Sequence, residues 1–100
     1  MREQIKNLVS IGVLPAEDVA SVEEVKFIEL IVSSIDGPIT DDEAKAIVSI
    51  FGFDEFFGIA WSILHLVETA PHWPIKECLI RTDNPWITIL IERAKNAGAL

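Results

Sequence analysis

The chain has 100 residues, of which 50% are apolar, and its sixteen acidic against eight basic residues leave a net charge of −8. This length predicts a single domain spanning residues 1–100, and the apolar content excludes an intrinsically disordered chain. A field of this sign repels phosphate backbones and anionic lipid headgroups, so we expect no nucleic acid and no membrane as partner, whereas a basic protein surface is attracted.

The sequence has a single cysteine, Cys78, which excludes an intramolecular disulfide and a cysteine-rich zinc site. Residues 1–10 lack the apolar core of a signal peptide, and no apolar run approaches the roughly 20 residues that span a bilayer. We therefore expect a soluble protein in the reducing environment of the cytoplasm.

Two helices are predicted in the first third of the chain. Residues 2–13 place apolar side chains on one helical face, which predicts an amphipathic helix that ends before Pro15. Ser21 and Glu24 have the spacing of a capping box, so the next helix is expected to start there and to run over residues 22–35. Apolar residues occupy well over one side of this second helix, and we expect it to lie in the interior. They are Val22, Val25, Phe27, Ile28, Leu30, Ile31, Val32 and Ile35.

A third helix follows a turn signal at residues 36–38, Asp-Gly-Pro. Thr40 and Glu43 form a second capping-box pattern at its start, and Gly52 is where it is expected to stop. Its predicted buried residues are Ala44, Ile47, Val48 and Phe51.

Residues 53–74 form the most apolar stretch, and within it residues 54–69 are predicted to be the central helix. Apolar side chains surround most of its circumference, so it must have neighbours on several sides. The apolar positions are Phe56, Phe57, Ile59, Ala60, Ile63, Leu64, Leu66 and Val67.

The last quarter of the chain predicts a short helix over about residues 75–81 and a longer one that starts at Asn84 as cap and Pro85 as first helical residue. Gly98 suits its C-terminal cap. The expected buried residues of the last helix are Trp86, Ile87, Leu90, Ile91 and Ala94. With no strand required, the predicted fold class is all-α: a compact bundle of about six helices, with HEAT-like stacking of helix pairs as a further expectation.

One stripe of the central helix combines aromatic and polar residues. Trp61, His65, Glu68 and Thr69 recur at helical spacing and share one face. His65 and Glu68 could bind a metal ion with His72 as third ligand, but the other helices offer no matching histidine. The interpretation that we favour is a buried His65 that hydrogen-bonds to a neighbouring helix or to Glu68.

No other residues form a catalytic constellation, so we expect neither an enzyme nor a cofactor. Cys78 lacks the electropositive setting of a reactive cysteine and is interpreted as a buried structural thiol. Ser62 has no nucleophile-elbow pattern around it. Trp73, between Pro71 and Pro74, either plugs the ends of the neighbouring helices, which we favour slightly, or serves as an exposed binding anchor.

The segment from residue 60 to residue 74 resembles a small family of uncharacterised bacterial helical proteins, with the shared pattern Ala-Trp-x-x-Leu-His-Leu-x-Glu-Thr-Ala-Pro-x-Trp-Pro. The resemblance covers residues 50–96 and departs at His72, where the family commonly has glycine. It implies no activity, and it marks His65, Glu68 and Trp73 as residues to test.

The sequence thus predicts a non-enzymatic interaction module, of an immunity-protein type, that binds a basic protein through its acidic surface. The predicted binding residues are Trp61, His65, Glu68 and Trp73. Two alternatives stay open. One is a small metal-dependent or hydrolytic enzyme that uses His65 and Glu68, and the other is a structural homodimer that buries apolar surface of the second and fourth helices.

Overall fold

The computed structural model describes residues 1–80 and 83–99. Within this range the chain forms five α-helices and two single-turn 3₁₀ helices, with no strand, so the all-α fold class is confirmed and the expected six helices are corrected to five. The elements are α1 (Glu3–Ser10), α2 (Val22–Ser33), α3 (Asp41–Val48), η1 (Phe56–Gly58), α4 (Ile59–Val67), η2 (Lys76–Cys78) and α5 (Pro85–Asn96).

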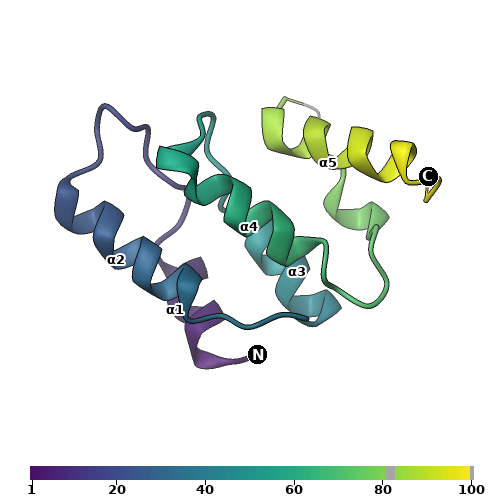
Figure 1. Cartoon of the computed structure of the whole chain (residues 1–100), viewed down its shortest axis with the longest axis horizontal. Helices are drawn as coiled ribbons and strands as arrows, with labels where there is room; N and C mark the ends of the chain where they lie inside the picture. Colours follow the sequence, from purple (N-terminus) through teal and green to yellow (C-terminus); the bar gives the residue numbers. More distant parts are fainter. Residues whose placement is uncertain (81–82, 100) are drawn as a thin grey trace.

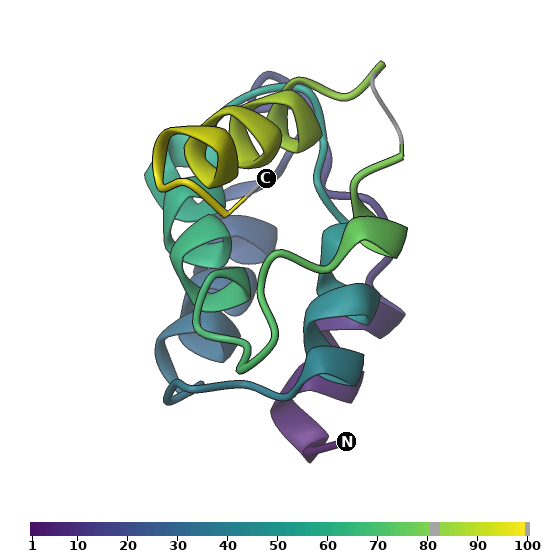
Figure 2. The ribbon, with the colours of Figure 1, turned by 90° about the vertical axis from the view of Figure 1, so that its right-hand side faces the viewer.

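The first four α-helices contact one another in a closed cycle: α1 packs on α2 and α3, and α4 packs on the same two helices. Figures 1 and 2 show α5 lying along α4, away from α1. Because every helix of the cycle has two neighbours, the apolar side chains of all four meet in one core. The radius of gyration of 12.9 Å is that of a compact chain of this length.

Both predicted capping boxes are present. The Ser21 hydroxyl accepts the Glu24 N–H, and the Thr40 hydroxyl accepts the Glu43 N–H, while each glutamate carboxylate accepts the N–H of its capping residue. These four hydrogen bonds satisfy N–H groups that a helix start leaves unpaired, so α2 and α3 begin where the sequence predicts.

The prediction that the second helix lies in the interior is wrong. Only one face of α2 packs on the core, through Ile28 and Val32, whereas Phe27 and Leu30 are 57% and 70% exposed. The reason lies in the neighbours: α2 contacts α1 and α4 on its core side, and no other described element covers its outer side.

The central helix is shorter than predicted, because α4 starts at Ile59. Phe56 and Phe57 have φ angles of +44° and +55°, a left-handed conformation that interrupts a right-handed helix and that bulky residues rarely adopt. Side chains stabilise this turn: Asp54 accepts the Phe56 N–H at 3.0 Å, and Glu17 accepts the Phe57 N–H at 2.6 Å. Phe57, which was predicted to be one of the apolar residues that pack around the central helix, is 58% exposed.

The last helix begins as predicted. Asn84 is buried, and its side-chain oxygen accepts the Trp86 N–H at 2.9 Å while its amide group donates to the carbonyls of Phe51 and Gly52. In place of the helix predicted over residues 75–81, the structure has the single turn η2. Residue 81, the last of the predicted range, lies outside the described residues. Ile91, predicted to be buried, is half-buried.

An ion pair ties the start of the chain to α3. The buried Glu43 carboxylate accepts the Arg2 N–H at 3.2 Å and the Arg2 Nε at 3.0 Å. The same guanidinium donates to the carbonyls of Asp36 and Pro38. Burial raises the pKa of Glu43, but hydrogen bonds from Thr40 and Arg2 outweigh it and leave the pKa below its ordinary value.

Candidate interaction face on helix α4

Helix α4 lies between α2 on one side and α5 on the other (Figure 1). The line of residues that points away from the core is Gly58, Ser62, His65 and Thr69, all exposed and three or four residues apart. We call this line, together with the flanking residues Trp61 and Glu68, the α4 face.

Trp61 and Glu68 both attach α4 to α5. The Trp61 ring meets the Trp86 ring edge to face, with 4.9 Å between ring centroids. Both oxygens of Glu68 accept hydrogen bonds from the Arg93 guanidinium, at 2.8 and 2.9 Å, and these bonds raise the pKa of Arg93. The two predicted binding residues are therefore half-buried.

His65 lies on the outer line of α4 and is exposed, so the interpretation of a buried histidine is wrong. No hydrogen bond joins its imidazole to any described residue, and both oxygens of Glu68 accept hydrogen bonds from Arg93 instead. The sequence did not predict the exposure of His65, because the apolar residues around α4 indicated neighbours on several sides. In the structure, the helices that pack on α4 do not cover the side on which His65 lies.

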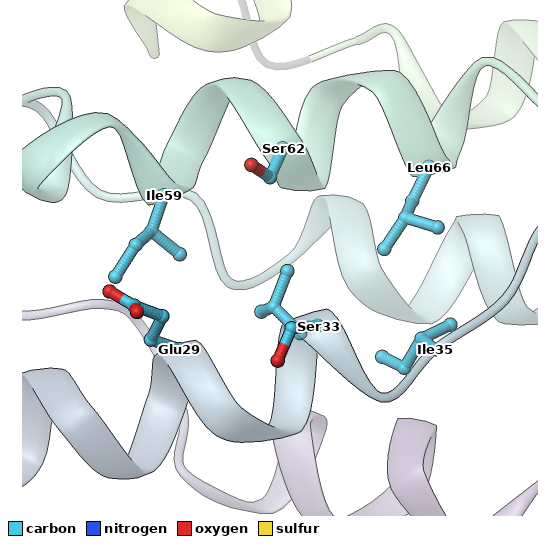
Figure 3. Close-up of a pocket in the computed structure, with 7 residues that line it drawn as sticks. Glu29, Ser33, Ile35, Ile59, Ser62 and Leu66 are labelled. Carbon is cyan, nitrogen blue, oxygen red and sulfur yellow. The ribbon is translucent and has the colours of Figure 1, made fainter.

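A groove lies between the outer parts of α4 and α2, on the side of the α4 face opposite α5 (Figure 3). Its apolar floor consists of Val32 and Ile35 with Ile59 and Leu66, and its volume is about 260 Å³. Glu29, Ser33 and Ser62 supply its polar groups. Sequence reasoning did not identify this groove, because it requires knowing that α2 and α4 are neighbours.

Trp73 is half-buried and packs against the core after the turn that ends α4. Its backbone N–H donates a hydrogen bond to the carbonyl of Ala70. This placement agrees better with the predicted plug than with an exposed anchor. Among residues 1–80 and 83–99, no hydrogen bond, ion pair or ring contact joins Trp73 to His65 or Glu68, and neither of the two pockets described here is lined by the predicted binding residues together.

His72, the proposed third metal ligand, is turned to α3. Its N–H and Nδ1 meet the two oxygens of Asp41 at 3.1 and 2.6 Å. The backbone hydrogen bond from His72, the largest cause, holds the pKa of Asp41 below its ordinary value of 3.8. Together with Lys45, Lys76 and Glu77 these residues line a second pocket of about 360 Å³.

Within residues 1–80 and 83–99, no three His, Cys, Asp or Glu side chains gather in a group that could hold a metal ion. Cys78 is half-buried, and burial, the largest cause, raises the pKa of its thiol, which disfavours the reactive thiolate form. No helix of the described residues has the length and apolar character needed to cross a membrane.

The sequence did not predict that two phenylalanines before α4 are exposed. Phe53 and Phe57, in the turn of residues 53–57 that precedes α4, are 67% and 58% exposed. We call this segment the aromatic turn. A signal for it is present in Phe57-Gly58, where a glycine inside the predicted helix indicates a break in the pattern.

Comparison of this chain with protein-family models, with curated proteins and with solved structures gives no match. The resemblance to the small bacterial family therefore stays a prediction, and a function has to be argued from the geometry and charge of the molecule.

Proposed function

We propose that this chain is a non-enzymatic interaction module of the cytoplasm, of an immunity-protein type, which binds a basic protein through the α4 face. His65 contributes its exposed ring, and Trp61 and Glu68 contribute the parts that packing leaves accessible. Trp73, half-buried after the turn that ends α4, lies outside this face and is proposed as a separate, peripheral contact. An aromatic and histidine surface on a strongly acidic chain suits an arginine- or lysine-rich partner, since aromatic rings attract cations and the net charge of −8 does so as well.

The observation that carries this proposal is an acidic surface without cationic partners. A large set of carboxylates is exposed and makes no hydrogen bond or ion pair with any described residue; they are Glu3, Asp18, Glu23, Glu29, Asp36, Asp42, Glu55, Glu77 and Glu92. Helix N-terminal charges account for Glu3, Glu23 and Asp42. The others add to a field that speeds association with a basic protein.

Retention of host proteins on the immobilised chain tests the proposal. The expected result is a basic protein, identified by mass spectrometry, that binds at about 50 mM salt and is lost at about 500 mM, because salt screens exposed charges. Its purified form should then bind the wild-type chain and bind His65→Arg more weakly.

The matched control for His65→Arg is Asn7→Arg, which adds the same charge at an exposed position of α1. Equal weakening by both variants would mean that only net charge matters and that the α4 face is not the binding surface. Retention of no basic protein would contradict the proposed function.

A structural homodimer is a second candidate, favoured by one observation: Phe27 and Leu30 are neighbours on the outer side of α2 and are mostly exposed. Light scattering with size-exclusion chromatography is expected to show a dimer that Leu30→Glu dissociates, while Val13→Glu, at another exposed apolar residue, leaves it intact. A monomer at all concentrations would remove this candidate.

The enzyme alternative has less support, because Arg93 occupies both oxygens of Glu68. The finer fold prediction, HEAT-like stacking of helix pairs, also stays a proposal. The pairs α1–α2 and α3–α4 each pack together, but contacts of α1 with α3 and of α2 with α4 close the group into a cycle.

A further inference from the structure

The groove between α2 and α4 has a carboxylate at one end and an apolar end opposite. Figure 3 shows the Glu29 carboxylate beside Ile59, with Ile35 and Leu66 at the far end and the hydroxyl groups of Ser33 and Ser62 between them. A long cationic side chain has a charged head at the end of an apolar stem. Its head would meet the carboxylate end of the groove, and its stem would lie along the apolar residues.

Glu29 differs from the other glutamates that adjoin packed surface. Glu43 is paired with Arg2, and Glu68 is paired with Arg93. No described residue forms a hydrogen bond or an ion pair with Glu29, although its carboxylate lies on the apolar rim of the groove. The groove therefore offers an apolar floor and an uncompensated negative charge together.

Each polar group of the groove can accept a hydrogen bond: the Glu29 carboxylate only accepts, and the hydroxyl groups of Ser33 and Ser62 have lone pairs. The Ser33 hydroxyl donates its proton to the carbonyl of Leu30, so its lone pairs remain for a donor. A guanidinium has five N–H donors and no acceptor, and its planar fork matches a carboxylate. The volume of about 260 Å³ is below the roughly 300–1,000 Å³ typical of sites for drug-sized ligands, and it suits one side chain.

We propose that this groove receives an arginine side chain of the basic partner, with the guanidinium on Glu29 and the methylene stem on Val32, Ile59 and Leu66. The inference rests on the proposed function and adds the residue type and the place of contact. The partner is a different protein, because a second copy of this chain, with a net charge of −8, does not bring the excess of positive charge that the proposed function requires.

Titration of the isotope-labelled chain with n-butylguanidinium, followed by NMR, tests the groove without a partner. Saturable shifts in the millimolar range are expected in residues 29–35 and 59–66. Glu29→Gln should weaken binding about three- to fivefold, the range of an exposed ion pair. Glu23→Gln, which removes the same charge from another side of α2, should leave the affinity unchanged.

Pentanoate and n-butylammonium are the comparison ligands. Pentanoate has a similar stem with the opposite charge and is expected not to bind. Equal binding of pentanoate, equal affinity in Glu29→Gln, or no saturable shift in these segments would overturn the proposal. Tighter binding of n-butylammonium than of n-butylguanidinium would overturn the choice of arginine.

The proposed function and this inference fail in different experiments. If the wild-type chain retains a basic partner and Glu29→Gln retains it equally well, the groove is not the contact, and the function stands. If no basic partner is retained but n-butylguanidinium binds at Glu29, the proposed function fails, and the specificity of the groove for a guanidinium stands.

Discussion

At the scale of single residues, Glu43 is a buried side chain that holds several segments of the chain together. It completes the cap of α3 and neutralises Arg2, so one buried carboxylate joins the start of the chain, the 36–38 turn and α3. A buried charge of this kind is stabilising only while its partners are present.

Glu43→Gln is expected to lower the free energy of unfolding by about 1.5–3 kcal/mol, the range for hydrogen bonds to charged groups. Denaturant titration measures this. The control is Glu92→Gln, an exposed residue of α5 that should change stability by less than about 0.5 kcal/mol. Equal effects of the two substitutions would show that the Arg2–Glu43 pair contributes nothing.

Acid should destabilise the chain through Asp41 and Glu43. Both have a pKa below the ordinary values of 3.8 and 4.5, Asp41 chiefly through the His72 N–H and Glu43 because its hydrogen bonds outweigh its burial. The unfolded chain therefore binds protons first as the pH falls, so the stabilisation present above about pH 4.5 is lost below it. Unfolding measured between about pH 6 and 3 should show this decline, and Glu43→Gln should show a shallower one.

Residue roles that depend on local spacing were predictable, and those that depend on distant residues were not. Ser21, Thr40 and Asn84 cap helices within a few residues of themselves, and their spacing reveals it. Arg2 and Glu43 are 41 residues apart, and no pattern in the sequence links them. The exposure of His65 likewise depends on where α2 and α5 lie.

At the scale of elements, the aromatic turn stores strain. Two consecutive phenylalanines in the left-handed region cost about 1–2 kcal/mol each, and such strain concentrates at functional positions. The neighbouring Gly52 is constrained by contact instead: a Cβ there would lie 2.7 Å from the carbonyl oxygen of Leu14.

Phe57→Gly is expected to raise the free energy of unfolding by about 0.5–1 kcal/mol, because glycine adopts positive φ without strain and the lost ring is mostly exposed. Phe53→Gly is the control, since Phe53 is similarly exposed and has no positive φ; it should be neutral or destabilising. A loss of stability in Phe57→Gly would mean that the Phe57 ring contributes more than its backbone costs.

The existence of α1, α2, α3 and α5 followed from periodicity and caps, whereas the start of α4 did not. Residues 54–58 have the apolar content of a helix, but the backbone N–H groups of Phe56 and Phe57 donate to the carboxylates of Asp54 and Glu17 and so hold the segment in a turn. The Glu17 contact comes from a loop 40 residues earlier. Tertiary contacts therefore override the helical pattern there.

At the scale of the whole molecule, the exposed carboxylates repel one another, and salt should stabilise the fold. Raising NaCl from about 10 to 200 mM is expected to raise the melting temperature by about 3–6 °C, the shift that somewhat under 1 kcal/mol produces in a domain of this size. Partner binding should weaken over the same range. A fall in melting temperature would mean that the screened ion pairs, Arg2–Glu43 and Arg93–Glu68, outweigh the repulsion.

The fold class and the acidic surface were predictable because composition and periodicity determine them. The cycle of helix contacts was not, since helices with one apolar face can pair in several ways. The groove beside α4 and the open side of α2 are consequences of that pairing, and so the surfaces that matter for function appear only in three dimensions.

The edge-to-face pair of Trp61 and Trp86 gives the chain a built-in optical probe. With three tryptophans and no tyrosine, near-ultraviolet absorption comes almost entirely from indole rings. Two indoles at 4.9 Å are close enough for their electronic transitions to couple, so circular dichroism can follow the separation of α5 from α4. Ligands that loosen this contact could then be detected in solution without an attached dye.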